Sequence, residues 1–257
     1  MFELIVVGLV IGLLVGLTGT GGGALLTPIL ILGFKVHTMT AIGSDLVASF
    51  FMKPVGAIVH ARHRTVRKDL VRLLVLGSLP GAVIGVALLV YLGHGRAPGL
   101  LNPVLGVALV LSTFAIVFRA TPVRKIAPVK LTGEIHPRTL KLMTLALGFF
   151  GAILVGFTSV GSGSIMVAGT MILYPELTIG ELVGTDLVQA IPLLGIASLG
   201  HAIVGDVRYS ISIPLALGAI FGVYCGALMS AKGVRSQEVR YGLTVVLFAT
   251  GLRLIFS

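Results

Sequence analysis

Two glycine-rich runs combine the residue types that bind small anions. They read GLTGTGGG at 16–23 and GFTSVGSG at 156–163. Because glycine costs about 1 kcal/mol relative to alanine inside a helix, each run predicts a break between two helical pieces. Amides at the start of a helical piece, with its positive dipole end, bind anions, and nearby hydroxyls add donors. The predicted substrate-binding residues of the runs are Thr18, Gly19, Thr20, Gly21, Gly22, Gly23, Thr158, Ser159, Gly161, Ser162, Gly163 and Ser164.

The same runs also have a structural interpretation, because small residues let helices pack closely in membranes. One glycine cluster does not separate the two interpretations, but two matching clusters that also contain hydroxyls favour a binding site. The first run is not a phosphate-binding P-loop. Ala24, Leu25 and Leu26 stand where the lysine and the hydroxyl residue of that motif would follow.

A lysine lies in the middle of an apolar stretch. Lys53 is near the centre of residues 39–60, where a buried ammonium group is costly without a partner. It could attract an anionic substrate, pair with Asp45 two helical turns earlier on the same face, or reach the membrane surface. We favour the first two roles. The matching position of the second half is Leu194, so the charge is asymmetric.

Four further ionisable residues are candidates for coupling or gating. Asp45 and Asp186 each follow a glycine near the start of an apolar stretch, where an acidic residue can also cap a helix. His60 and His201 occupy matching span ends, where histidine can also interact with a helix C-terminus. Gln189 could bind a substrate oxygen or bond between helices. Two histidines alone do not make a metal site, and we expect no metal and no cofactor.

The composition indicates a protein that crosses a membrane several times. Of its 257 residues 56% are hydrophobic and 11% charged, whereas a soluble domain has roughly 25% charged residues. The net charge of +10 reflects Lys and Arg in short loops, which set orientation, so it implies no nucleic-acid partner. Cys225 is the only cysteine, which excludes an intramolecular disulfide. The chain lacks a nucleophile–base set, so we do not expect an enzyme.

The apolar stretches predict an all-α polytopic fold with about eight transmembrane segments in two homologous halves. The first stretch would measure roughly 46 Å as one helix, although a single span needs about 20 residues. It is therefore either a tilted, broken helix or a re-entrant pair of half helices, and the fifth stretch has the same features. The stretches are 4–34, 39–60, 71–92, 100–118, 142–174, 182–204, 211–230 and 241–256.

An internal repeat relates the two halves. Adding 141 to the residue number carries GSDLV at 43–47 onto GTDLV at 184–188, and His60 onto His201. Paired acidic residues and paired histidines at one offset are hard to obtain by chance. We predict a first membrane repeat at 1–118, a cytoplasmic polar linker at 119–141 and a second membrane repeat at 142–257.

The relative orientation of the halves stays open. If each long stretch crosses the membrane once, the halves are parallel; if each is a re-entrant hairpin, they are inverted. Both arrangements place the two most basic loops, at 61–70 and 119–141, in the cytoplasm. Matching interruptions in two halves are a pattern typical of a transporter site near the middle of the bilayer.

The chain resembles the TauE/SafE family of sulfite exporters. The likeness rests on the run GLTGTGGGALLTP, its echo GFTSVGSGS, the two Gly-Ser/Thr-Asp-Leu-Val runs, the paired histidines and the central polar loop. It covers nearly the whole chain. The resemblance implies a multi-pass carrier of the cell inner membrane for small sulfur-containing anions. Because the second run departs from the first and no lysine matches Lys53, the two half-sites are not equivalent.

The expected function is secondary transport, in the direction of export, of anions such as sulfite, sulfoacetate or other organosulfonates. The anion would bind between the repeats, at the glycine runs and Lys53, and rocking of the halves would expose it alternately. The alternative is a passive anion channel lined by the same runs. The expected partners are the small anionic substrate and the lipid bilayer, and a homo-oligomer stays open.

Overall fold

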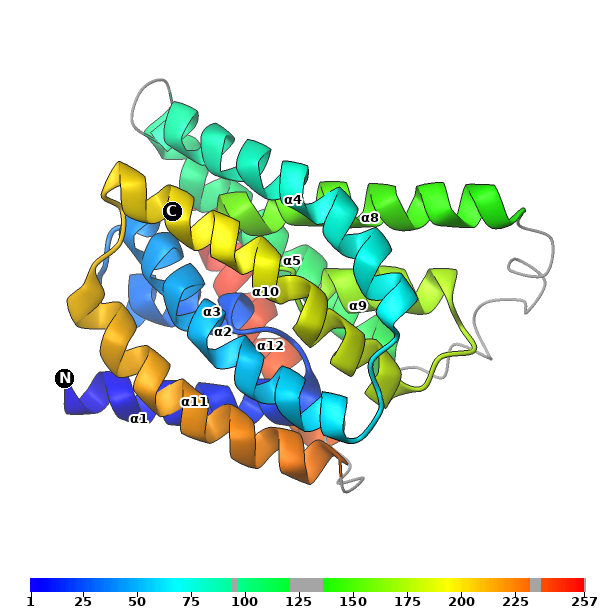
Figure 1. Cartoon of the computed structure of the whole chain (residues 1–257). Helices are drawn as coiled ribbons and strands as arrows, with labels where there is room; N and C mark the ends of the chain where they lie inside the picture. The colour runs from blue at the N-terminus through cyan, green and yellow to red at the C-terminus, as the bar shows by residue number, and fades with distance from the viewer. Residues whose placement is uncertain (94–96, 121–135, 232–236, 257) are drawn as a thin grey trace.

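The computed structural model describes residues 1–93, 97–120, 136–231 and 237–256, and their regular secondary structure is entirely helical. The predicted all-α class is therefore confirmed. Figure 1 shows α4 and α8 along one side of the molecule and α1 and α11 along the other. The helices are α1 (Phe2–Thr18), α2 (Gly23–Pro28), η1 (Ile29–Gly33), α3 (Thr38–Arg62), α4 (Lys68–Tyr91), η3 (Pro98–Leu100), α5 (Leu101–Ala120), α8 (Pro137–Thr158), α9 (Ile165–Leu173), α10 (Ile179–Val204), α11 (Tyr209–Ala231) and α12 (Gln237–Ile255).

Six helices in these ranges are long and apolar enough to cross a membrane, namely α3, α4, α5, α8, α10 and α11. Large apolar side chains such as Phe51, Phe150 and Phe221 are exposed on their outer faces, which fits contact with lipid chains. The protein is therefore a multi-pass membrane protein. The apolar helices Phe2–Thr18 and Gly242–Ile255 are shorter, so the count of about eight segments stays a prediction.

A glycine-rich run divides each of the first and fifth apolar stretches. The first stretch is divided into α1 and the contiguous α2 and η1, and the fifth into α8 and α9. α1 ends at Thr18, where Gly19 adopts a left-handed conformation with φ 63° and donates its N–H to Val15 O. α8 ends in the same way, because Ser159 has φ 62° and donates its N–H to Val155 O. A left-handed residue after the last turn is a common way to end a helix. We call residues 19–22 the first break and 159–164 the second break.

The helices of one half pack on helices of the other. α1 runs parallel to α11, because Gly8 approaches Leu215 and Gly16 approaches Val223. α8 runs parallel to α4, because Gly77 approaches Leu145 and Gly85 approaches Ile153. Figure 1 shows both pairs side by side. In both pairs a Cβ at the glycine would collide with backbone of the partner helix, so the glycines permit the close approach.

α3 and α10 cross the centre of the molecule in antiparallel directions. The amide of Arg67, just after α3, donates to Thr185 Oγ1 of α10 at 3.1 Å. The amide of Arg208, just after α10, donates to Ser44 Oγ of α3, also at 3.1 Å. Arg67 and Arg208 are 141 positions apart, and so are Ser44 and Thr185, so the two bonds join matching residues. The two bonds thus tie each helix end to the beginning of the other helix.

The polar stretch expected at 119–141 differs from the structure at both ends. α5 continues through Arg119 to Ala120, and α8 already begins at Pro137. The stretch 121–135 lies outside the described residues. Arg119 therefore belongs to a helix and not to a loop, and only 6% of its surface is exposed.

Candidate functional site

The two breaks touch each other at the centre of the fold. A Cβ on Gly21 would lie 2.9 Å from the amide nitrogen of Gly163. A Cβ on Gly163 would overlap the backbone of Thr20 and Gly21, and a Cβ on Gly23 would overlap the carbonyl of Ser159. Close backbone approach is therefore what the glycines permit here. In this structure the group that approaches the backbone of each break is the backbone of the other break.

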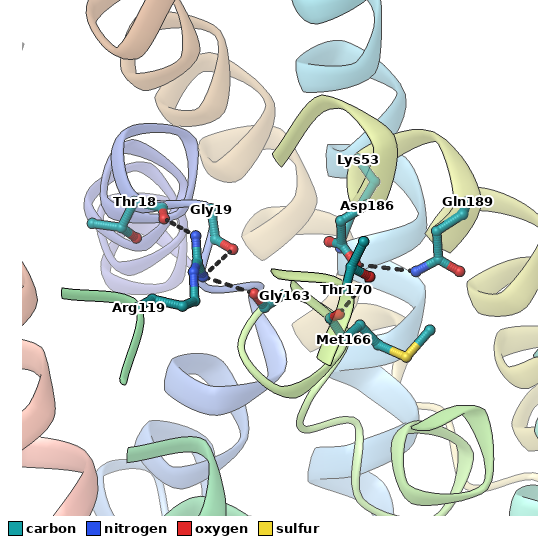
Figure 2. A network of polar contacts seen from close by, with 9 residues as sticks. All are labelled: Thr18, Gly19, Lys53, Arg119, Gly163, Met166, Thr170, Asp186 and Gln189. Carbon is teal, nitrogen blue, oxygen red and sulfur yellow. Dashed lines mark hydrogen bonds and ion pairs between the residues drawn. The ribbon is translucent and has the colours of Figure 1, made fainter. Parts of the chain in front are cut away.

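Arg119 joins the two breaks. Its guanidinium donates to Thr18 O at 3.2 Å, to Gly19 O at 3.3 Å and to Gly163 O at 2.9 Å, as Figure 2 shows. A cation at the C-terminal end of α1 also interacts favourably with the helix dipole. The role of Arg119 was not predictable from sequence. A basic residue at the end of an apolar stretch is ordinarily a loop residue that sets orientation.

Replacing Arg119 with lysine is expected to weaken the contact between the breaks. An ammonium group cannot reproduce the planar fork that reaches three carbonyls at once. Each hydrogen bond from a charged group contributes about 1.5–3 kcal/mol, so we expect a loss of several kcal/mol of stability for Arg119→Ala and a smaller loss for Arg119→Lys. Thermal unfolding of the purified protein in detergent measures both. Arg253→Lys, near the end of α12, is the control; equal melting temperatures for all four proteins would contradict the role.

Several predicted substrate hydroxyls are engaged within the protein. Thr18 donates to Leu14 O at 2.6 Å, and Thr158 donates to Leu154 O at 2.7 Å. These matching bonds to the carbonyl four residues earlier satisfy the ends of α1 and α8. Thr18 and Thr20 form a pair of hydroxyls 2.9 Å apart, and the Ser164 hydroxyl donates to that of Ser112 at 2.9 Å. Ser162 and the glycines of both breaks are buried.

A buried ion pair connects the two central helices. Lys53 Nζ of α3 lies 3.1 Å from Asp186 Oδ2 of α10, and the lysine is 1% exposed. Gln189 Nε2 donates to Asp186 Oδ1 at 3.0 Å, and Figure 2 shows the three side chains together. Gln189 Oε1 is buried without a hydrogen-bond partner among the described residues. The partner of Lys53 is thus Asp186, and not Asp45, although pairing with Asp45 is one of the two roles that the sequence favours for this lysine.

Asp45 lies in a second polar cluster, made mostly of hydroxyls. Thr27 donates to Asp45 Oδ2 at 2.7 Å, and Ser49 donates to Asp45 Oδ1 at 3.0 Å. The hydroxyls of Thr27 and Ser159 are 2.6 Å apart. Neither Asp45 nor Asp186 caps a helix, because α3 begins at Thr38 and α10 at Ile179. We call Asp45, Thr27, Ser49 and Ser159 the hydroxyl cluster.

The two histidines lie in the last turns of α3 and α10, away from the ion pair. His60 Nδ1 is 2.9 Å from Thr65 Oγ1. His201 Nδ1 is 3.6 Å from Asp206 Oδ2, and its Nε2 is 3.2 Å from Gly156 O. The structure therefore does not gather the predicted coupling residues at one point. The histidines belong to the helix ends, whereas the two aspartates belong to the centre.

The centre of the fold therefore combines one buried ammonium group, two buried carboxylates, a buried amide and a series of hydroxyls within apolar helices. An ammonium group that is held inside a membrane protein can bind an anion, and a carboxylate can compete with that anion for it. Helices of both halves supply these groups. A movement of one half against the other would change these contacts.

Comparisons with known proteins agree on a family of membrane transport proteins. Residues 4–254 match the family model described as "Sulfite exporter TauE/SafE". The chain is 33% identical over 256 residues to "Probable membrane transporter protein YjnA" of Bacillus subtilis (strain 168), covering 98% of this chain and 99% of that protein. It is 28% identical over 227 residues to "Probable membrane transporter protein YdhB" of the same organism, covering 87% and 88%. No solved structure matches the chain.

Proposed function

We propose, from the premise that the chain belongs to the sulfite exporter TauE/SafE family, that it is a secondary carrier of small sulfur-containing anions. The substrates are sulfite, sulfoacetate or other organosulfonates, and the direction is export across the cell inner membrane. Membrane transport follows from the family and the relatives, whereas substrate and direction are part of the proposal. An inside-negative potential favours the exit of an anion, by about 2.3 kcal/mol per charge per 100 mV.

The buried pair of Lys53 and Asp186 is the observation that carries the proposal. Lys53 sits well inside a helix of spanning length and its ammonium is 3.1 Å from a carboxylate of the other half. A buried pair of this kind is weak evidence for stability, since its desolvation cost offsets much of the attraction. A role in binding explains its presence better. A substrate sulfonate or sulfite replaces Asp186 beside Lys53. The Oε1 of Gln189, which has no hydrogen-bond partner among the described residues, accepts a hydrogen bond from an anion that carries a proton or a hydroxyl group.

Two inverted repeats are part of the proposal. α2 and α3 are antiparallel. Gly22, just before α2, approaches Met52, whereas Thr27, near the end of α2, bonds to Asp45, which comes earlier in α3. In Figure 1 α2 and η1 accordingly turn back after α1. The matching helices α3 and α10 are antiparallel, because the end of each bonds to the beginning of the other, whereas a parallel duplication would point both in the same direction. These directions support a re-entrant hairpin in each half and an inverted relation between the halves, with the 119–141 region in the cytoplasm.

Alternating access then takes place at the contact between the breaks. With the breaks touching and Arg119 bound to both, the structure corresponds to a state in which this contact is closed. Opening on one side separates the breaks and frees amides of the second break and hydroxyls such as Ser162 for the anion. Thr18, Thr20, Thr158 and Ser164 contact the substrate only after their present bonds have changed. His60 and His201 act at the helix ends as gating residues.

Anion counterflow in proteoliposomes tests the function. Vesicles containing the full chain are loaded with unlabelled sulfite or sulfoacetate, and uptake of labelled anion is followed. A carrier gives saturable uptake that is stimulated by substrate on the opposite side. An excess of sulfate or chloride should not reduce this uptake. Uptake that does not saturate and is not stimulated from the opposite side would indicate a channel. No protein-dependent flux of any of these anions would overturn the proposal.

A further inference from the structure

The two central carboxylates are neutralised in different ways, although they occupy matching positions in the two halves. Asp186 pairs with the ammonium of Lys53. Asp45 is completely buried, and within the described ranges its carboxylate makes no ion pair. Its partners are the hydroxyls of Thr27 and Ser49. A carboxylate that is removed from water without a cation is strongly disfavoured in its charged form, so Asp45 needs a bound cation or a proton.

Among the residues that the structure describes, the surroundings of Asp45 supply no fixed compensating charge. The elements packed against α3 are α2, η1, α5, α10 and α11. α2 and η1 have no titratable residue, and α5 has only Arg119, which is bound to the breaks. Lys53 of α3 is paired with Asp186 of α10. His201 of α10 and the nearby Asp206 lie against Gly43 of α3. The remaining titratable groups of these elements are Glu181 of α10, Tyr209, Tyr224 and Cys225 of α11, and His60 and the exposed Arg62 at the end of α3.

The hydroxyl distances favour a proton over a metal cation. Thr27 Oγ1 lies 2.7 Å from Asp45 Oδ2 and 2.6 Å from Ser159 Oγ. These are ordinary distances for hydrogen bonds between oxygens. Neighbouring oxygens around a small octahedral cation such as Mg²⁺ are about 2.9 Å apart, which is longer than the two contacts here. The hydroxyl cluster thus has the geometry of a chain of hydrogen bonds.

We propose that Asp45 is the site at which the carrier binds its coupling proton, and that Thr27 and Ser159 relay this proton between the two halves. When Asp45 is ionised, Thr27 donates to its Oδ2. When Asp45 is protonated, it donates to Thr27, which then donates to Ser159. The bond between Thr27 and Ser159 can run in either direction, as this reversal requires. Each hydroxyl gives up one proton and receives one, so no net charge stays on the relay.

The position of the relay connects proton binding to the transport cycle. Thr27 belongs to α2, just after the first break, and Ser159 is the first residue of the second break. Any movement that separates the breaks also separates these two hydroxyls. Proton transfer along the relay is then allowed in one state and interrupted in another. The inference rests on the proposed function, because it names the coupling ion of the same carrier.

Infrared spectroscopy of the purified full chain tests proton binding without any transport assay. Wild type at near-neutral pH is expected to show the carbonyl stretching band of a protonated carboxylic acid, with the usual shift in heavy water. Asp45→Asn should lose this band. Asp69→Asn, which removes an exposed carboxylate at the start of α4, should keep it. Absence of the band in wild type, or its persistence in Asp45→Asn, would overturn the assignment.

Transport experiments separate this inference from the proposed function. Asparagine resembles the neutral, protonated aspartate, so Asp45→Asn should retain counterflow but lose accumulation driven by a pH gradient. Thr27→Val, which keeps the shape of the side chain, should keep the infrared band and lose the gradient-driven accumulation. If wild type shows counterflow and Asp45→Asn still responds to the gradient, only the proton site is wrong. If wild type shows no counterflow, the carrier function itself is wrong.

Discussion

Replacing Lys53 with methionine is expected to abolish anion counterflow and to lower the stability of the protein by about 3–5 kcal/mol. The stability loss follows because Asp186 would keep its burial and lose its cation. The transport loss follows because the proposed anion site would lose its fixed positive charge. Counterflow in proteoliposomes and unfolding in denaturing detergent measure the two effects on the same preparation.

A double variant separates these two effects. Lys53→Met combined with Asp186→Asn removes both charges, and the asparagine amide can still bond to Gln189. Replacing a buried ion pair by neutral groups of similar volume is often close to neutral for stability. We therefore expect the double variant to unfold like wild type while counterflow stays absent. A stable double variant that still transports would show that the pair is structural only.

The matched control is Lys68→Met at the exposed start of α4. It makes the same chemical change where the ammonium is in water, and an exposed charge contributes little to stability. We expect both stability and counterflow to stay as in wild type. A loss of counterflow in this variant would mean that the total charge of the protein, and not the position of Lys53, supports transport.

Much of the architecture could be predicted from the sequence because it depends on local rules. Apolar length and glycine content determine where helices form and where they end, and α1 and α8 indeed stop at the glycine-rich runs. The spacing of Gly8, Gly12 and Gly16 places them on one face of α1, where α11 packs. The choice of α11 as partner depends on contacts between distant parts of the chain. No local pattern contains that information.

The same limit applies to the centre of the fold. The spacing of Asp45 and Lys53 along one helix allows a pair between them, which is one of the roles expected for Lys53. The antiparallel crossing of α3 and α10 instead brings Asp186 to the lysine. Arg119 shows the limit more strongly, because a charge at the end of an apolar helix normally lies in a loop. Only the meeting of three carbonyls from two breaks makes its burial favourable.

The glycine runs were the strongest sequence signal, and a single substitution separates their two interpretations. Gly163→Ala is expected to destabilise the protein by about 3 kcal/mol or more, at the upper end of overpacking costs. A Cβ there would overlap the backbone of Thr20 and Gly21, which cannot move aside as a side chain could. Unfolding in denaturing detergent and the yield of monodisperse protein measure the effect.

Gly242→Ala is the control for this substitution. Gly242 lies in α12 with open space around its Cα, so alanine should be neutral or stabilise the helix by about 1 kcal/mol. If Gly163→Ala destabilises and Gly242→Ala does not, the contact between the breaks is structural in the closed state, and substrate must separate them in order to bind. If Gly163→Ala unfolds like wild type but loses counterflow, the glycine serves the anion directly. The breaks would then be apart for most of the transport cycle.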